Sequence, residues 1–198
     1  MSRREYSEIL QVYTAVAQNT AVISNEVNIE ESIETTVEVT IGLDTTTAHI
    51  GTIVTPQVSA HDSGNNWYNL GSLAQTLGVG TGASEAITND PLDAGDDEIS
   101  CASTTGFVTV GYRIIKDGTL ANSEVVQQVS YDSNKSIGIN PGVDKEHLKA
   151  VVMWNVADRQ VFIIPGTYKR VRLLVDNTYD ADGSSIIYAA MVSTVKGS

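Results

Sequence analysis

The sequence predicts an all-β protein, an antiparallel β-sandwich or jelly roll preceded by an N-terminal arm. Three observations lead to this fold class: one run with strict period-two alternation, a series of short β-branched segments separated by turn residues, and no long amphipathic helical pattern after residue 25. The length of 198 residues suits a single domain. We therefore expect an arm of residues 1–29 and a β-sandwich domain of residues 30–198.

The arm carries apolar residues at a spacing closer to the helical period than to strand alternation, which favours a helix within residues 6–23. Its end, residues 20–23, has instead the composition of an extended chain. The side chains of Ile9, Leu10 and Tyr13 need burial, yet they precede the clear strands and no turn links them to a hairpin. We expect the arm to order on a neighbouring chain, with these three residues as interface candidates.

The clearest strand covers residues 33–41, because apolar side chains share one parity and polar side chains occupy the other. The Gly- and Asp-rich residues 71–97 indicate a long loop. Further strands are predicted at residues 106–115, 125–131, 148–156, 160–164, 168–175 and 185–195. The expected core residues include Val37, Val39, Ile41, Val108, Val110, Val152, Phe162, Leu173, Val175 and Ile187.

A β-hairpin is predicted by the β-branched residues 46–58, the turn-forming residues 61–66 and a short extended segment after them. That segment starts with Trp67 and Tyr68, two aromatic residues directly after the turn. Exposed aromatic rings at the rim of a sandwich can stack on sugar rings, whereas aromatic residues at a strand start more often serve a core or an interface. Trp67 and Tyr68 are therefore interface candidates, and carbohydrate stacking is the alternative.

The chain is strongly acidic, with 12 Lys and Arg residues against 24 Asp and Glu residues and a formal net charge of −12. This charge disfavours binding to phosphate backbones, so no nucleic-acid partner is expected. From Glu5 to Tyr112, fifteen acidic residues occur without any Lys or Arg. The charge serves either as a solvating surface or as a docking surface for a basic partner, with Asp96, Asp97 and Glu98 as interface candidates.

Motifs for membrane insertion and for catalysis are not found in the sequence. No run approaches 18 apolar residues, so no membrane partner is expected. The three histidines, His49, His61 and His147, are scattered without a catalytic or zinc-binding spacing. The single cysteine, Cys101, cannot form an internal disulfide, and we expect a small apolar side chain in or beside a strand. The sequence thus predicts no enzyme, no catalytic residue, no cofactor and no metal site.

Two acidic segments leave calcium binding open as an alternative. Residues 93–98 hold four carboxylates, and residues 176–183 contain a D-x-D-G fragment similar to part of a calcium-binding loop. The second segment lacks the bidentate glutamate and the flanking helices of such a loop. Turn formation by Asp and Gly explains its residues equally, and we expect a hairpin turn there.

Two segments together carry a resemblance to a known family. Residues 54–70 have the form of a strand, a D-x-G-x-x-W turn and a second strand, and residues 166–175 with 185–192 form a closing hairpin. This combination resembles the small β-sandwich proteins that cement or decorate the capsids of tailed bacteriophages. The resemblance implies a non-enzymatic jelly-roll virion protein on the capsid surface, made in the host cytoplasm. It also implies binding to the major capsid protein and a homo-oligomer, with a trimer favoured. The alternative is a carbohydrate-binding or receptor-binding β-sandwich module.

Overall fold

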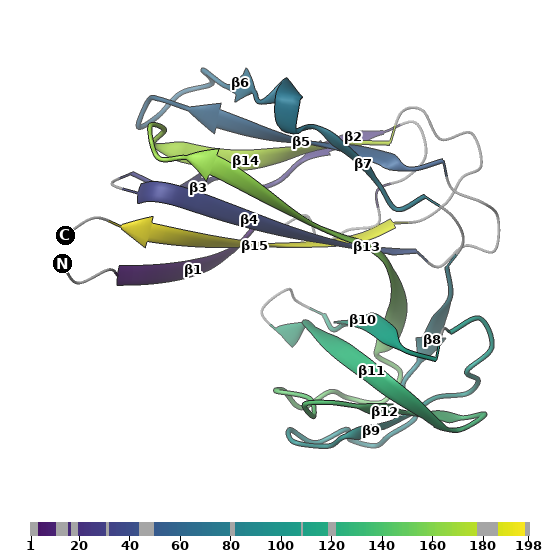
Figure 1. The fold of residues 1–198 in the computed structure, drawn as a ribbon. Coiled ribbons are helices and arrows are strands. Elements are labelled where there is room, and N and C mark those ends of the chain that lie inside the picture. Colours follow the sequence, from purple (N-terminus) through teal and green to yellow (C-terminus); the bar gives the residue numbers. More distant parts are fainter. Residues whose placement is uncertain are drawn as a thin grey trace. The chain divides into compact units, whose positions relative to one another are not determined.

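The computed structural model confirms the predicted all-β fold: the described residues form fifteen β-strands and one short 3-10 helix (Figure 1). It describes residues 4–10, 16, 20–30, 32–43, 50–79, 82–107, 109–118, 122–177 and 186–196, with only the backbone at 4–10, 133 and 186–196. None of the helical segments among these residues has the length and apolar character needed to cross a bilayer.

The chain divides into two compact units. Unit 1 consists of Met1–Ile41, His49–Val79 and Asp158–Ser198, and unit 2 consists of Gly42–Ala48 and Gly80–Ala157. The sequence-based division at residue 30 is a different partition of the chain. Whether residues 1–29 dock on a neighbouring chain stays a prediction.

Unit 1 contains two antiparallel sheets (Figure 1). In the first sheet the strand order is β1 (Arg4–Leu10), β15 (Ile186–Lys196), β4 (Ser32–Leu43) and β13 (Val152–Pro165). In the second it is β2 (Ala21–Ile23), β14 (Arg170–Asp176), β5 (Thr52–Ser59) and β6 (Tyr68–Asn69). The short strands β3 (Val27–Asn28) and β7 (Gln75–Leu77) pair with β14 and β5, and the 3-10 helix η1 covers Gly71–Leu73.

The core of unit 1 follows from strand alternation. In β14 the side chains of Val171, Leu173 and Val175 are buried, whereas Arg172 and Leu174 between them are only partly covered. Burial of apolar area stabilises the fold by about 25 cal/mol per Å². The alternation of apolar side chains therefore fixes which face of the strand turns inward. Six expected core residues of unit 1 are confirmed as buried: Val37, Val39, Ile41, Phe162, Leu173 and Val175.

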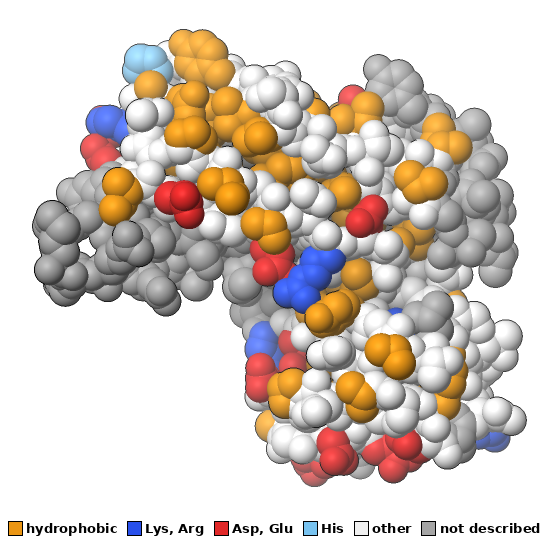
Figure 2. Space-filling model, viewed as in Figure 1, with side chains coloured by type: hydrophobic (Ala, Val, Ile, Leu, Met, Phe, Trp, Pro, Cys, Tyr) orange, Lys and Arg blue, Asp and Glu red, His pale blue; other side chains and the backbone are white. Residues whose placement is uncertain are grey.

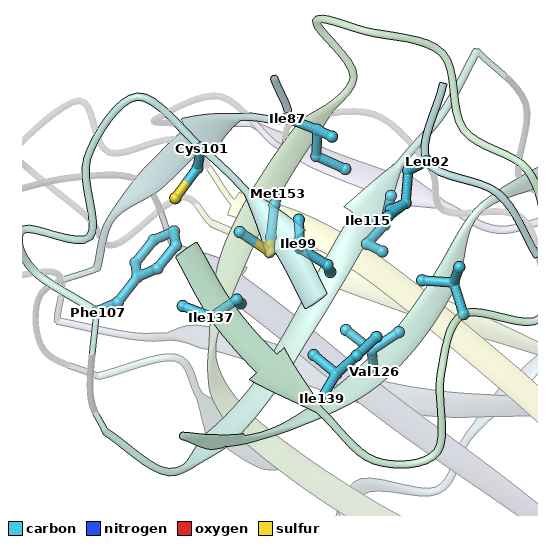
Figure 3. Close-up of a cluster of buried hydrophobic side chains, with 11 residues drawn as sticks. Ile87, Leu92, Ile99, Cys101, Phe107, Ile115, Val126, Ile137, Ile139 and Met153 are labelled. Atoms are coloured by element: carbon cyan, nitrogen blue, oxygen red, sulfur yellow. The ribbon is translucent and has the colours of Figure 1, made fainter. Parts of the chain in front are cut away.

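Unit 2 contains the remaining strands of the first sheet, which continues through β13, and it has a core of its own (Figure 3). Its strand order is the first part of β13, then β10 (Gly111–Lys116), β11 (Glu124–Ser133), β12 (Ser136–Ile139) and β9 (Glu98–Ser100), with β8 (Ser84–Ala86) also paired to β13. Side chains from these strands and their loops form the buried cluster: Ile87, Leu92, Ile99, Cys101, Phe107, Ile115, Val126, Ile137, Ile139, Val143 and Met153.

Three sequence-based expectations about local structure are wrong. Residues 4–10 form strand β1 and not part of a helix, because antiparallel pairing with β15 supplies their backbone hydrogen bonds. The two strands expected at 148–156 and 160–164 are one continuous strand, β13. Val110 is 59% exposed and is not a core residue, because β10 begins only after it.

The continuity of β13 has a clear cause at Asp158 and Arg159. The predicted strands 148–156 and 160–164 leave these polar residues between them, but both side chains have partners that let the strand continue. Asp158 accepts a hydrogen bond from the backbone N–H of Gly78 at 3.3 Å, and Arg159 pairs with Glu38 of β4. Charged residues on the solvated face of a strand need no turn when neighbouring elements satisfy them.

The hairpin predicted around residues 61–66 is confirmed. Gln57 pairs with Asn69 and Val58 pairs with Tyr68, so β5 and β6 are antiparallel neighbours across that turn.

Val152, also expected in the core, is only half-buried. The remaining expected core residues, Val108 and Ile187, lie outside the residues whose side chains are described.

Candidate functional site

The predicted aromatic site lies where the β5–β6 hairpin meets β14. The guanidinium carbons of Arg170 and Arg172 lie over the ring of Trp67, at 4.8 Å and 4.1 Å from its centroid. Residues two apart on a strand share a face, so β14 presents both cations on the side that carries Trp67. Cation–π contacts of this kind contribute about 0.5–2 kcal/mol each, depending on desolvation.

Arg170 binds the hairpin turn directly. It is 5% exposed and donates to the backbone oxygens of His61 and Gly64 at 2.8 Å and 2.9 Å and to Ser59 Oγ at 3.3 Å. Its remaining partner is the Glu26 carboxylate, at 2.7 Å. The guanidinium thus replaces water at the turn carbonyls and fixes the turn to the sheet.

Arg172 is held more loosely. Its Nε donates to Gln57 Oε1 at 2.7 Å, and Gln57 Nε2 donates to Asn69 Oδ1 at 2.7 Å. Burial lowers the pKa of Arg172, the charge of Glu26 opposes this change, and the positive charge of Arg170 lowers the pKa further. The side chains of Arg172, Gln57 and Asn69 thus form a row of hydrogen bonds across the neighbouring strands β14, β5 and β6.

The two aromatic candidates have different surroundings. Trp67 is half-buried and its ring is engaged by guanidinium groups, whereas Tyr68 is 58% exposed. The Trp67 ring therefore serves this hairpin, and Tyr68 is the aromatic side chain here that is open to a partner. The alternation of β14 signals that Arg170 and Arg172 share a face, but sequence reasoning did not connect them with Trp67.

The acidic candidates Asp96, Asp97 and Glu98 lie in what we call the acidic loop, residues 93–98 of unit 2, and all three are exposed. Backbone hydrogen bonds fix this loop: Gly95 N–H donates to Val143 O at 2.8 Å, and Val143 N–H donates to Asp96 O at 2.9 Å. The carboxylate of Asp96 accepts from the Asp93 N–H at 3.0 Å and so shapes the loop itself. Asp97 and Glu98 are exposed, and their carboxylates have no hydrogen-bond or ion-pair partner among the described side chains.

The close approach of Gly142 to this loop depends on its missing side chain. A Cβ at Gly142 would lie 2.5 Å from the Gly95 oxygen and 2.7 Å from the Asp96 oxygen. Atoms at these distances repel strongly, so only glycine allows the two backbones to run this close. The acidic loop is thus held in place by its neighbour rather than suspended in solvent.

Ion pairs neutralise much of the acidic charge in unit 1. Basic residues from the C-terminal part of the chain meet acidic residues from the N-terminal part: Arg170 with Glu26, Lys169 with Glu30 and Asp62, and Arg159 with Glu38. No such pair involves the acidic loop among the residues with described side chains. Figure 2 shows Asp and Glu side chains gathered on unit 2 at the edge where Figure 1 places β9 and β12. This edge of unit 2 therefore carries negative charge.

A buried histidine of unit 2 lies between two carboxylates, which sequence reasoning missed. His147 is fully buried; its Nδ1 lies 3.2 Å from Asp117 Oδ2, and its Nε2 lies 2.7 Å from Glu124 Oε1. Glu124 also accepts from the backbone N–H groups of Asp144 and Lys145. This cluster joins the residue after β10, strand β11 and the loop after β12, so it holds three segments of unit 2 together. The scattered histidines gave no spacing signal that could have found it.

Unit 2 also buries the guanidinium of Arg113, which lies over the ring of Phe107 at 4.8 Å from its centroid. It donates to the backbone oxygen of Tyr112 at 2.7 Å and to the side chain of Gln128. Burial lowers its pKa to about 10, with Tyr131 acting in the opposite direction. The guanidinium therefore stays charged at neutral pH and ties β10 to β11.

Cys101 is confirmed as a small buried residue beside a strand, 2% exposed and bridged to Ile87. Burial raises the pKa of its thiol, the charge of Glu85 raises it further, and a 3.2 Å hydrogen bond to the Ser103 oxygen opposes the rise. A thiol with these surroundings stays protonated at neutral pH and is a poor nucleophile.

We expect Cys101 to react with a maleimide or Ellman's reagent only when the protein unfolds, because reaction needs both exposure and thiolate. The measurement is labelling at pH 7.5 with and without guanidinium chloride. Native protein should label at least about 100-fold more slowly than unfolded protein. Equal labelling rates in the two conditions would show that the thiol is accessible in the fold.

Several other candidates lie partly or wholly outside the described side chains. Ile9 and Leu10 belong to β1, of which only the backbone is described, and Tyr13 and most of residues 176–183 lie outside the described residues. Of the histidines, His61 is an exposed turn residue, and His49 is outside the described part. Among the residues that are described, no group of three or more His, Cys, Asp or Glu side chains is arranged to hold a metal ion.

The chain matches no protein-family model and no curated protein. Among solved structures it is similar to the VP2 subviral particle of infectious bursal disease virus, with 11% identity and a TM-score of 0.26 over 98% of this chain and 41% of that chain. A structure of the Gt strain of that virus gives 11% identity and a TM-score of 0.22 over 99% and 40%. The chain thus spans about two fifths of these chains, and a likeness this low carries no inference about activity or partner.

Proposed function

We propose that this chain is a non-enzymatic structural protein of a tailed-bacteriophage virion, which decorates or cements the capsid by binding the major capsid protein. The observation that carries the proposal is the acidic loop, whose backbone is fixed and whose carboxylates have no cationic partner among the described side chains. A fixed patch of like charge suits attachment to a basic area of a protein lattice, since complementary charge speeds and orients docking.

The two segments that carry the resemblance to decoration proteins are neighbours in unit 1. Strand β5 from the first segment pairs with β14 from the second, from Ile53 with Asp176 to Ser59 with Arg170. Trp67 of the turn motif packs against the arginines of β14. This proximity supports the resemblance, because both segments belong to one structural element.

We propose a homo-oligomer, with a trimer favoured, as the assembled form on the capsid. Exposed apolar side chains on unit 1 support a contact between copies. Val161 and Ile163 on β13 are 47% and 58% exposed, and Ile33, whose backbone oxygen lies against Gly166 just beyond β13, is 59% exposed. Neighbouring apolar side chains in water favour burial in an interface. Light scattering of the purified chain measures the oligomeric state.

The attachment test uses empty capsids assembled from the major capsid protein encoded in the same phage genome. The double variant Asp97→Asn/Glu98→Gln is expected to bind these capsids roughly five-fold more weakly at 50 mM salt, because exposed ion pairs contribute about 0–1 kcal/mol each. Its melting temperature should stay unchanged, since neither carboxylate has a partner within the described residues. Asp96 is retained because it caps Asp93.

The matched control is Glu34→Gln, which removes one exposed charge from β4 of unit 1 and leaves the acidic loop unchanged. Because it removes a single charge, Glu34→Gln is compared with the single variants Asp97→Asn and Glu98→Gln. It should bind the capsids like the unmodified chain. Binding of the double variant and the unmodified chain should converge at about 0.5 M salt, where the Debye length is only a few Å. Attachment that is insensitive to salt, or no attachment at all, contradicts the proposal.

A further inference from the structure

Unit 2 contains a hollow of about 660 Å³ that belongs to none of the sites above. Its volume falls within the roughly 300–1,000 Å³ of small-molecule sites. Two segments form its walls, the loop after Cys101 and the end of β11 with the turn that follows it. The lining residues are Ser103, Thr104, Thr105, Tyr131, Asp132 and Asn134.

Backbone hydrogen bonds hold the two walls together. Thr104 N–H donates to Asn134 O at 3.0 Å, and Cys101 N–H donates to Lys135 O at 2.7 Å. The first wall closes in a turn, in which Phe107 N–H donates to Thr104 O at 3.1 Å and Gly106 has a φ of 84°. The buried ring of Phe107 anchors this turn in the core cluster (Figure 3). A ligand would therefore bind a preformed site, and little free energy would be lost in ordering the protein on binding.

The polar groups of the hollow are also oriented in advance. Ser103 Oγ donates to Thr105 Oγ1 at 2.9 Å and accepts from the Thr105 N–H at 3.0 Å. Ser130 Oγ donates to Asp132 Oδ1 at 3.0 Å. The other carboxylate oxygen, Asp132 Oδ2, has no donor among the described residues and leans over Gly138, where a Cβ would come within 2.9 Å of it.

A bulge in β11 accounts for the position of Asp132. Tyr131 pairs with Ile137 and Ser133 pairs with Ser136, so the register shifts between them and Asp132 is the extra residue. Bulges redirect a side chain out of the regular alternation and are common beside binding sites. Tyr131 itself packs against the core cluster, which fixes the aromatic wall.

The lining chemistry selects a class of ligand. An anion finds no Lys, Arg or His among the lining residues, and a calcium ion, which takes six to eight oxygen ligands, finds a single carboxylate. Sugar hydroxyls both donate and accept, so they match a carboxylate acceptor, an amide and three hydroxyls at once. The C–H face of a sugar ring matches the tyrosine ring.

We propose that this hollow binds an uncharged sugar residue of a glycan, with Asp132 and Asn134 binding its hydroxyls and Tyr131 contacting its C–H face. This activity goes beyond capsid attachment and does not depend on it, because the acidic loop and the hollow use different residues. We assign carbohydrate binding to this hollow and not to Trp67, because the guanidinium groups of Arg170 and Arg172 already lie over the Trp67 ring. A virion protein with such a pocket would hold the particle on cell-surface polysaccharide.

The test is saturation-transfer NMR of the full chain with glucose, galactose, mannose, N-acetylglucosamine and their short oligomers, followed by calorimetry. At least one of these saccharides should bind with a Kd below about 10 mM. Asp132→Ala and Thr105→Val should each weaken that binding at least ten-fold. Both residues are exposed, so the variants should keep the melting temperature of the unmodified chain.

Two controls separate this site from the alternatives. Tyr68→Ala removes the exposed aromatic ring of the β5–β6 hairpin and should leave sugar affinity unchanged, as should Asp97→Asn in the acidic loop. Loss of binding in Tyr68→Ala with retention in Asp132→Ala overturns the proposal in favour of the hairpin. Binding that disappears with EDTA and returns with calcium, or no binding by any of these sugars, also overturns it. None of these outcomes bears on the capsid test.

Discussion

Replacing His147 by alanine is expected to destabilise unit 2 by about 3 kcal/mol, because it leaves a cavity in a fully buried site and removes the hydrogen-bonding partner of two carboxylates. The side chains of Asp117 and Glu124, only 20% and 10% exposed, would lose the imidazole that lies between them. At roughly 2–4 °C per kcal/mol, the melting temperature should fall by about 6–12 °C. Thermal and urea unfolding followed by circular dichroism measure this loss.

The matched control is His61→Ala. His61 is an exposed residue of the β5–β6 turn, and the hydrogen bonds that it makes with Ser59 and Arg170 use its backbone. Alanine keeps that backbone, so the melting temperature should change by less than about 1–2 °C. Equal stability of the two histidine variants would show that the His147 cluster contributes nothing to the fold.

Replacing Arg170 by alanine is expected to have a comparable effect on unit 1, again about 3 kcal/mol. The variant removes the hydrogen-bond donor of two turn carbonyls, those of His61 and Gly64. It also removes one of the two cations that lie over the Trp67 ring. Lysine at this position should not restore stability, because one ammonium group cannot reproduce the planar fork of the guanidinium. Unfolding curves and the fluorescence of Trp67 report the change.

Arg172→Ala provides the comparison for Arg170. Among the described residues, Arg172 makes one hydrogen bond, to Gln57, and one ring contact, and its removal leaves no turn carbonyl without a donor. We expect a loss of about 1 kcal/mol. If Arg172→Ala costs as much as Arg170→Ala, the ring contacts dominate and the turn hydrogen bonds contribute little. A loss below about 1 kcal/mol in both variants contradicts the role assigned to this cluster.

Part of the candidate site was predictable from local sequence. The turn motif before Trp67 placed an aromatic residue at the hairpin, and the exposure of Asp97 and Glu98 followed from their polar surroundings. The partners of Trp67 were not predictable, because Arg170 lies more than a hundred residues further along the chain. Strand pairing joins such residues, and no spacing within the sequence encodes which strands pair.

The charge pattern shows the same division. The sequence alone determined that the segment before Tyr112 is acidic and the segment after it holds most of the cations. Only the tertiary structure decided that Arg159 and Lys169 pair with carboxylates of the acidic segment, whereas the acidic loop has no ion pair among the described side chains. Net charge is additive along a chain, whereas a surface potential depends on which residues become neighbours.

The sequence by itself determined the all-β class, the alternation that buries Val37 and Val39, and the hairpin at residues 61–66. Each depends on side-chain periodicity or turn chemistry within a few residues. Only the tertiary structure decided the continuity of β13 and the strand state of residues 4–10, because backbone hydrogen bonds to distant strands override a weak local pattern. The His147 cluster and the hollow beside Asp132 were decided there too, since both join segments that only folding brings together.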